Sequence, residues 1–127
     1  MPISKSGIEY SYNMKLLTKA IETALADPKR THETAQVPVC KFFNPCGAAT
    51  WLIFAREPDE PDILWGLADL GMDCIEYGTI SLSELQGVRL QFGLTIERDI
   101  HFTPKHHANG ELWKMADYMN LETLAGI

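Results

Sequence analysis

The sequence has no long hydrophobic run. None of its apolar stretches approaches the roughly 18 residues that a transmembrane helix needs. The opening MPISKSGIEYSYNMK lacks the apolar core of a secretory signal, so we expect a cytoplasmic protein with no membrane partner. Cysteine is also scarce: three cysteines at irregular spacing make a poor disulfide framework, and we expect them to be free thiols.

Basic residues are few and scattered. Eleven Lys and Arg stand against seventeen Asp and Glu, which gives a net charge of −6, and Lys29 and Arg30 are the only adjacent pair. Binding along a phosphate backbone needs clustered cations, so direct nucleic-acid binding is not expected. An acidic surface serves solubility, and it also favours docking on a partner protein with a basic surface.

What is present is the composition of one ordinary globular domain. The 127 residues are 46% hydrophobic and 22% charged, and they contain no repeat and no long linker. Four short runs rich in branched and aromatic residues predict strands: VPVCKFF, TWLIFA, ILWGLADL and EYGTI. The loops between them are short, which favours an antiparallel meander, and TWLIFA is apolar on both faces, which is typical of a central strand.

Three segments have the spacing of helices. One apolar stripe predicts a helix over about residues 13–27 that ends before Pro28, and the polar loop PKRTHETAQ follows it; the stripe is Met14, Leu17, Ile21 and Leu25. Another predicts a C-terminal helix over about residues 110–121, with Asn109 as its N-cap; its members are Leu112, Met115 and Met119.

The helix between them has the clearest start. Ser81 and Glu84 have the spacing of a capping box, in which their side chains bond to otherwise unpaired main-chain N–H groups. The apolar face continues to Phe92, and Gly93 is expected to form the C-terminal cap. The chain is therefore predicted to be a single α+β domain over residues 1–127, with a mostly antiparallel four-stranded sheet packed by about three helices.

Four blocks in this order resemble a bacterial family known as domain of unknown function 2958: KFFNPCGAATWLIFARE, GLADLGM, GTISLSEL and GLTIERDIHFTP. The resemblance covers about residues 37–104. It implies cargo of plasmids, phages and integrative elements, often encoded near anti-restriction or conjugation genes. It therefore implies an accessory or anti-defence role. Cys46 and the His106–His107 pair do not belong to the family pattern, so the resemblance assigns them no role.

A metal site or a catalytic site would draw on the cysteines and the histidines. His101 and His106 have the spacing of a zinc-binding pair, but Cys40 and Cys46 are one residue too far apart for the other half. Cys46 lies in the turn NPCGAA, where a thiolate with a histidine base would be a nucleophile. We expect no metal, no cofactor and no catalytic residue. A small Cys/His-dependent or metal-dependent hydrolase is the alternative, and a DNA-binding regulator is a weaker one.

The segment IERDIHFTPKHH offers the first of two candidate binding surfaces. Ile96, Ile100 and Phe102 alternate, so Glu97, Asp99 and His101 should point outward from an extended chain. Arg98 would then point inward, where a buried arginine requires a carboxylate, and Asp69 is the predicted partner in a structural ion pair.

The second candidate surface is the loop REPDEPD, whose prolines and acids predict an exposed turn that presents Asp59, Glu60 and Asp62. Together the two surfaces predict a non-enzymatic binding protein. Its expected partner is a protein of the host or of the mobile element with a basic surface. The protein itself is expected to be a monomer or a homodimer.

Overall fold

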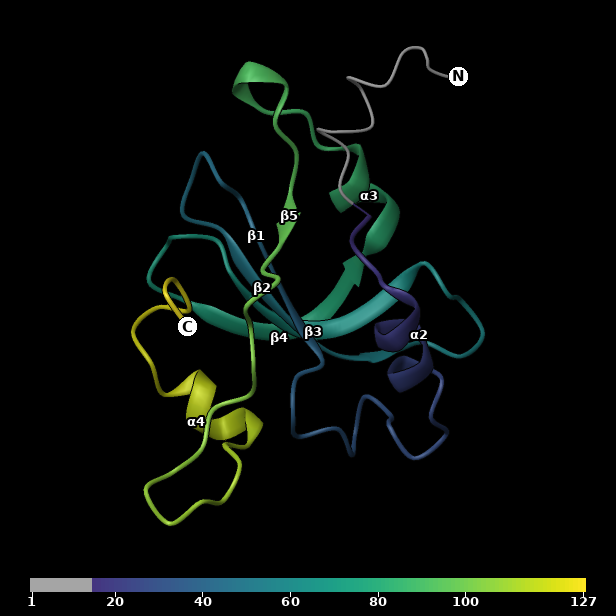
Figure 1. The fold of residues 1–127 in the computed structure, drawn as a ribbon, viewed down its shortest axis with the longest axis vertical. Coiled ribbons are helices and arrows are strands. Elements are labelled where there is room, and N and C mark those ends of the chain that lie inside the picture. The colour runs from purple at the N-terminus through teal and green to yellow at the C-terminus, as the bar shows by residue number, and fades with distance from the viewer. Residues whose placement is uncertain (1–14) are drawn as a thin grey trace.

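The computed structural model describes residues 15–127, in which a five-stranded antiparallel sheet carries helices on both faces (Figure 1). The order of the strands in the sheet is β4-β3-β2-β1-β5. The predicted α+β class and the antiparallel meander of the first four strands are confirmed. Along the chain the elements are α2 (Lys19–Leu25), β1 (Cys40–Phe43), β2 (Thr50–Arg56), β3 (Ile63–Asp69), β4 (Ile75–Ser81), α3 (Leu82–Gly87), the 3-10 helix η1 (Gln91–Gly93), β5 (Glu97–Arg98) and α4 (Met115–Met119).

The prediction of four strands missed β5. This strand has two residues, which pair with β1 through Phe43–Glu97 and Phe42–Arg98. Two residues are too few for an alternating pattern to stand out in a sequence. Its position matters for the site, because β5 forms one edge of the sheet and β4 forms the other.

Both faces of the sheet are covered, which explains why β2 is apolar throughout. Leu25 of α2 and Leu82 and Leu85 of α3 pack against one face. Tyr118 of α4 and Leu124 pack against the other. Figure 1 shows α2 and α3 to the right of the sheet, and α4 with the C-terminal segment at the lower left. The sheet is therefore the middle of three layers.

The first described helix is shorter than predicted. It begins at Lys19, because the side chain of Thr18 caps it by accepting a hydrogen bond from the N–H of Ile21 at 3.1 Å. It ends at Leu25, two residues before the predicted end at 27. Leu17 is buried although it precedes the helix, whereas Met14 lies outside the described residues.

The predicted start of α3 is confirmed, and its predicted end is wrong. The hydroxyl of Ser81 accepts the N–H of Glu84 at 3.2 Å. The helix then stops at Gly87, a residue that costs a helix about 1 kcal/mol relative to alanine. Phe92 therefore lies beyond the helix and is 87% exposed. Gly93 has the expected positive φ of 75°, but it ends η1 and not α3.

The C-terminal helix is also shorter than the predicted range of 110–121. Asn109 does not cap it: its side chain accepts the N–H of Glu111 at 3.0 Å inside a turn. Gly110 adopts a φ of 91° there, which a helix cannot accommodate. Helix α4 begins only after Lys114, whose N–H donates to Asp117 Oδ2 at 2.8 Å. None of the helices within residues 15–127 has the length and hydropathy needed to span a lipid bilayer.

Candidate functional site

The residues of the two predicted binding surfaces lie in two separate places. Asp59, Glu60 and Asp62 lie in the loop between β2 and β3, whereas Glu97 lies in β5 at the edge of the sheet. Strand β1 separates β2 from β5. The structure therefore does not bring these acids together into one surface, and each place has to be judged on its own contacts.

The predicted row next to β5 lines a shallow hollow of about 290 Å³, which we call the edge hollow. Glu97 and Asp99 are half-buried in it and His101 is exposed. Ile100 was predicted to point inward, but it is 66% exposed. The reason is that β5 ends at Arg98 and the chain turns, with the N–H of His101 donating to Asp99 Oδ1 at 2.9 Å. The alternation does not continue through this turn.

Asp99 serves the structure of the edge hollow. Lys41 is only 7% exposed, and its ammonium lies 3.5 Å from Asp99 Oδ2. The same ammonium donates to the main-chain oxygen of Ile127 at 3.1 Å. A buried lysine needs such partners, because an uncompensated charge away from water is strongly destabilising. Asp99 therefore neutralises Lys41, which weakens its candidacy as a docking group for a basic partner.

The predicted ion pair between Asp69 and Arg98 is wrong, and no ion pair within residues 15–127 joins them. Arg98 pairs with Phe42, so its side chain shares the face of the sheet that α2 covers. Its guanidinium donates to the main-chain oxygens of Lys15 and Leu16. Asp69 follows Leu67 by two residues and therefore faces the opposite side. The two side chains lie on opposite faces, and strands β2 and β1 lie between their strands.

Asp69 binds the C-terminal segment instead. Asp69 is 2% exposed, and its carboxylate accepts hydrogen bonds from the N–H of Gly71, the hydroxyl of Thr123 and the N–H of Leu124. Burial by itself would raise the pKa of Asp69, but these three hydrogen bonds together outweigh it and hold the pKa below its ordinary value. Asp69 is therefore a structural residue, as predicted, but its partners are Gly71, Thr123 and Leu124 and not Arg98.

The acidic loop between β2 and β3 is held in place by two of its own acids. Glu57 Oε1 accepts the indole N–H of Trp65 at 3.0 Å. Asp62 accepts the N–H of Ser83 at 2.8 Å and the hydroxyls of Ser81 and Ser83, and these bonds lower its pKa. Asp62 therefore fixes the start of α3. Asp59 and Glu60 remain as exposed acids at the tip of the loop.

This loop forms one wall of a larger hollow of about 670 Å³, which we call the groove. The other wall is the end of α2 and the turn that follows it. Ligand sites in proteins typically enclose about 300–1,000 Å³ and are lined mainly by apolar atoms with a few polar groups. The lining residues are Leu25, Ala26, Asp27, Pro28, Arg30, Thr31, His32, Glu33, Arg56, Glu57, Pro58 and Pro61.

The two arginines of the groove are engaged by the protein. Arg56 lies 2.8 Å from Glu22 Oε1, and its Nε donates to the main-chain oxygen of Pro61. Arg30 Nη1 donates to the main-chain oxygens of Val37 and Phe54. The carboxylates of Asp27 and Glu33, by contrast, are exposed at the groove. In the groove, therefore, the acids are exposed to solvent, whereas the guanidinium groups largely form hydrogen bonds within the protein.

Stacked rings hold the turn that follows α2 in place. His32 stacks on Trp65 with ring centroids 4.5 Å apart, and Trp65 stacks on Tyr77 at 5.7 Å. The hydroxyl of Tyr77 donates to the main-chain oxygen of His32 at 2.7 Å. These contacts hold residues 31–33 against the sheet, so the groove is preformed. The groove could not be predicted from the sequence, because PKRTHETAQ is polar and has no periodicity.

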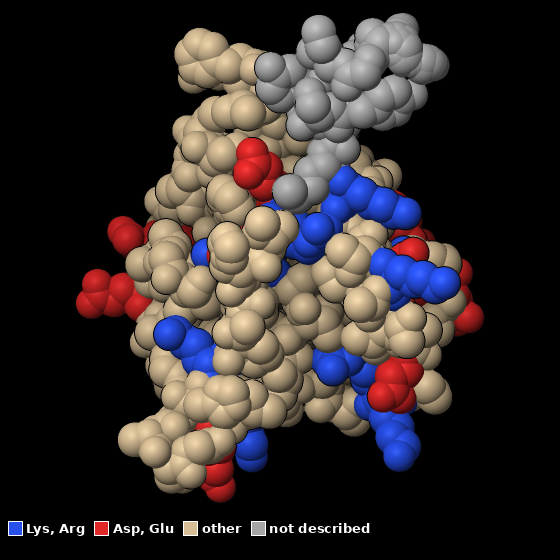
Figure 2. Space-filling view, in the orientation of Figure 1, with Lys and Arg blue, Asp and Glu red and all other residues tan. Residues whose placement is uncertain are grey.

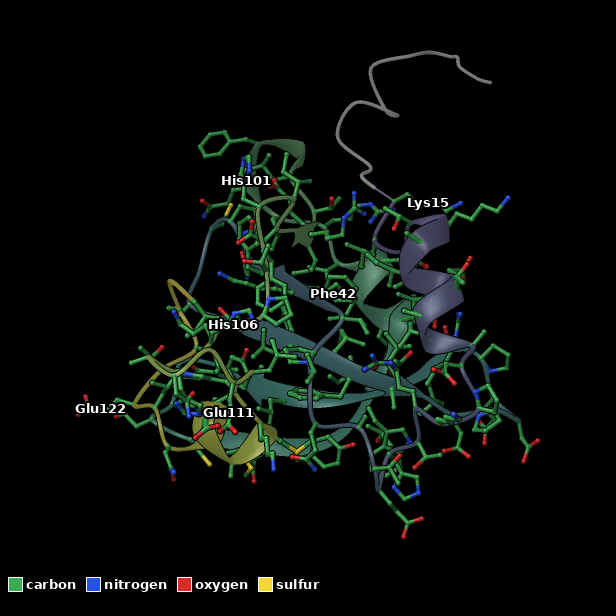
Figure 3. The ribbon with its side chains drawn as sticks, turned by 60° about the horizontal axis from the view of Figure 1, so that its bottom comes forward. Lys15, Phe42, His101, His106, Glu111 and Glu122 are labelled. Carbon is green, nitrogen blue, oxygen red and sulfur yellow. The ribbon has the colours of Figure 1, made fainter. Side chains whose placement is uncertain are left out.

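The cysteines and histidines do not converge. Burial raises the pKa of the Cys40 thiol to about 12, which removes it as a nucleophile. No histidine within residues 15–127 bonds to the Cys46 thiol, and the N–H of Cys46 donates to Asn44 Oδ1. No three His, Cys, Asp or Glu side chains of this range form a metal-ligating cluster. Figure 3 shows His101 near η1 and His106 further along, towards α4.

The comparison with known families gives one match. The family described as "Protein of unknown function (DUF2958)" matches residues 13–120. The chain belongs to this DUF2958 family. The match extends beyond residues 37–104, over which the sequence blocks resemble the family, and includes α2 and α4. No curated protein and no solved structure matches the chain.

Proposed function

We propose that the protein works by binding, and that its groove receives an extended basic segment of a partner protein. The observation that carries this proposal is the groove itself, which combines a preformed hollow of about 670 Å³ with exposed acids on one wall and at the tip of the loop that forms the other wall. Asp27 and Glu33 lie on one side, and Asp59 and Glu60 lie on the loop that makes the other. A basic side chain in the groove would meet Asp27 and Glu33, and a segment that extends past the loop would also approach Asp59 and Glu60.

The walls of the groove are restricted in conformation, which favours binding. Three prolines line it, Pro28, Pro58 and Pro61, and they restrict the backbone of both walls. A preorganised site loses little conformational entropy when it binds, so more of the interaction energy appears as affinity. The apolar part of the lining would take the aliphatic stems of Lys or Arg, whose charged ends reach the acids at the rim.

The charge of the remaining surface agrees with a partner that is a basic protein and not a nucleic acid. Figure 2 shows the Lys and Arg side chains in several separate groups on the face that carries β5 and α2, with uncharged side chains between them. A nucleic-acid interface needs a continuous basic patch, so the DNA-binding alternative gains no support from this face. The hydrolase alternative gains none either, because Cys46 has no histidine bonded to its thiol within residues 15–127.

The biological setting is part of the proposal. The resemblance to the family implies an accessory factor of a mobile genetic element, and we infer that the partner is a host or element-encoded protein that the factor modulates. Anti-defence activity is the form of modulation that this setting favours.

The test is a capture experiment with matched charge changes. The wild type, Asp59→Asn/Glu60→Gln and Glu111→Gln/Glu122→Gln are used as baits in a lysate of the native host. Glu111 and Glu122 are exposed and lie on the α4 side of the molecule, away from α2 (Figure 3). Both double variants remove two charges, so they differ only in where the charge is lost.

We expect the groove variant to capture less of a specific protein and the control variant to capture as much as the wild type. The loss should be larger at low salt, because ions screen long-range attraction. Equal capture by all three baits, or equal loss in both variants, would overturn the role of the groove.

A further inference from the structure

Strand β4 forms an edge of the sheet with its outer side unpaired. All seven of its residues, Ile75–Ser81, pair with β3. Within residues 15–127, no main-chain group outside β3 bonds to the main chain of β4. In an antiparallel ladder every second residue of an edge strand directs its N–H and C=O outward. Strand β4 thus presents a row of unpaired donors and acceptors along its whole length.

Of the features that usually prevent pairing, this edge has one charged residue, Glu76. Proteins protect edge strands by making them short, by bulges, by proline or by lysine. The other edge, β5, is protected in this way, since it has two residues and leads into a turn. Strand β4 has seven residues, IEYGTIS, with no proline and no lysine, and its register with β3 has no irregularity. Its composition also favours a strand.

We propose that β4 pairs with β4 of a second copy of this chain, in an antiparallel dimer with its twofold axis at Gly78. This register places Tyr77 opposite Thr79 and Glu76 opposite Ile80 of the other copy. Glu76 is the single charged residue of β4, so no like charges face each other. The interface is isologous, and the two sheets become one continuous sheet.

Gly78 suits the centre of this pairing. A Cβ built at Gly78 meets no other atom within 4 Å, so the face of the sheet at this position is open. With no side chain on either glycine, nothing crowds the face of the sheet at the twofold axis.

The charge on β4 favours a second copy over a basic partner. A basic segment would gain only one carboxylate, that of Glu76, from the whole strand. The chain as a whole has a charge of −6, which makes most of its surface repel another copy. Strand β4 is a nearly neutral exception, where that repulsion is weakest. Higher salt should therefore strengthen the dimer, whereas it should weaken the binding of a basic segment in the groove.

The experiment compares two lysine substitutions at open positions. Gly78→Lys puts two ammonium groups opposite each other at the proposed axis. Gly87→Lys adds the same charge in α3, where a Cβ also meets no atom within 4 Å. Light scattering after gel filtration and sedimentation velocity, both over a range of concentrations, give the mass of each protein. Circular dichroism confirms that both variants are folded.

We expect the wild type and Gly87→Lys to form dimers at the same concentrations, and Gly78→Lys to have the mass of one chain there. Hydrogen exchange of the β4 amides should slow as the wild type becomes more concentrated, and should not change with concentration in Gly78→Lys. A wild type that stays monomeric at the highest concentration overturns the proposal. So does a Gly78→Lys protein that dimerises as well as the wild type. Neither result bears on the groove.

Discussion

The carboxylate of Asp69, at the end of β3, accepts the main-chain N–H of Leu124 at 2.8 Å, although 55 positions separate the two residues. Leu124 is fully buried on the α4 face of the sheet. The hydrogen bond therefore fixes the C-terminal segment at the position where its apolar side chain enters the core. A single carboxylate links the central sheet to the last turn of the chain.

Replacing this carboxylate should destabilise the protein. In Asp69→Asn an amide NH₂ takes the place of one of the accepting oxygens and faces an N–H donor. Hydrogen bonds to charged groups contribute about 1.5–3 kcal/mol, so we expect a loss of that order in the free energy of unfolding, measured by urea denaturation.

The loss should depend on pH in a defined direction. Because the hydrogen bonds lower the pKa of Asp69 in the folded state, its stabilisation is present above the pKa of the unfolded chain, about 3.9, and is lost as the pH falls through the lower folded pKa. The stability gap between the wild type and Asp69→Asn should therefore narrow below about pH 4. A gap that is the same at pH 7 and in acid would contradict this account.

Arg98 and Asp69 should act independently. Arg98→Ala removes the bonds to the main-chain oxygens of Lys15 and Leu16, on the other face of the sheet from Asp69. The losses in Arg98→Ala and Asp69→Asn should add to within about 0.5 kcal/mol in the double variant. The matched comparison is Asp69→Asn/Thr123→Val, where the two side chains bond at 2.8 Å and the losses should not add. Losses that do not add for Arg98 and Asp69 would show that the two residues interact, as the ion pair predicted from the sequence requires.

The ion pair predicted between Asp69 and Arg98 shows which features could not be predicted from the sequence. The positions of β1 to β4 followed from apolar runs and turns, and the start of α3 followed from the spacing of Ser81 and Glu84. One error came from the two-residue strand β5: an alternating pattern was extended past Arg98 into a turn, so Ile100 was predicted to point inward. Arg98 does point inward as predicted, but Asp69 lies on the opposite face of the sheet.

The candidate site was predictable only in part. Asp59 and Glu60 were identified because acids between prolines predict an exposed loop. The opposite wall was not, since Asp27, His32 and Glu33 lie in a polar segment without periodicity. Their positions are set by tertiary contacts, above all the stacking of His32 on Trp65, and such contacts between distant segments leave no local pattern.

Substitutions of the acids in the loop between β2 and β3 should differ in their effect on stability. Asp62→Asn should lower the melting temperature, because Asp62 accepts three hydrogen bonds at the start of α3. Asp59→Asn and Glu60→Gln should leave it nearly unchanged, as surface substitutions usually alter the stability by less than about 0.5 kcal/mol. Scanning calorimetry of the three single variants checks this. Equal losses in all three would show that the loop is held by its charge and not by Asp62.

Two glycines that pair across β3 and β4 should respond differently to alanine. Gly66 and Gly78 are partners in the ladder, but a Cβ at Gly66 would lie 2.2 Å from the main-chain oxygen of Leu52, whereas one at Gly78 meets nothing within 4 Å. Overpacking of this kind typically costs about 1–3 kcal/mol. We expect that loss in Gly66→Ala, measured by urea denaturation, and little loss in Gly78→Ala. Similar stabilities for the two variants would show that β2 and β3 can move apart at Gly66.

The binding of a partner in the groove can be tested most directly by photo-crosslinking in the native host. Benzoylphenylalanine is placed at Pro58, which lines the groove, or at Ala108, an exposed residue outside it. We predict that irradiation joins the Pro58 variant to one discrete protein and that Asp59→Asn/Glu60→Gln in the same chain reduces the adduct. A discrete adduct from Ala108 with none from Pro58, or a Pro58 adduct unaffected by the charge change, would contradict the account.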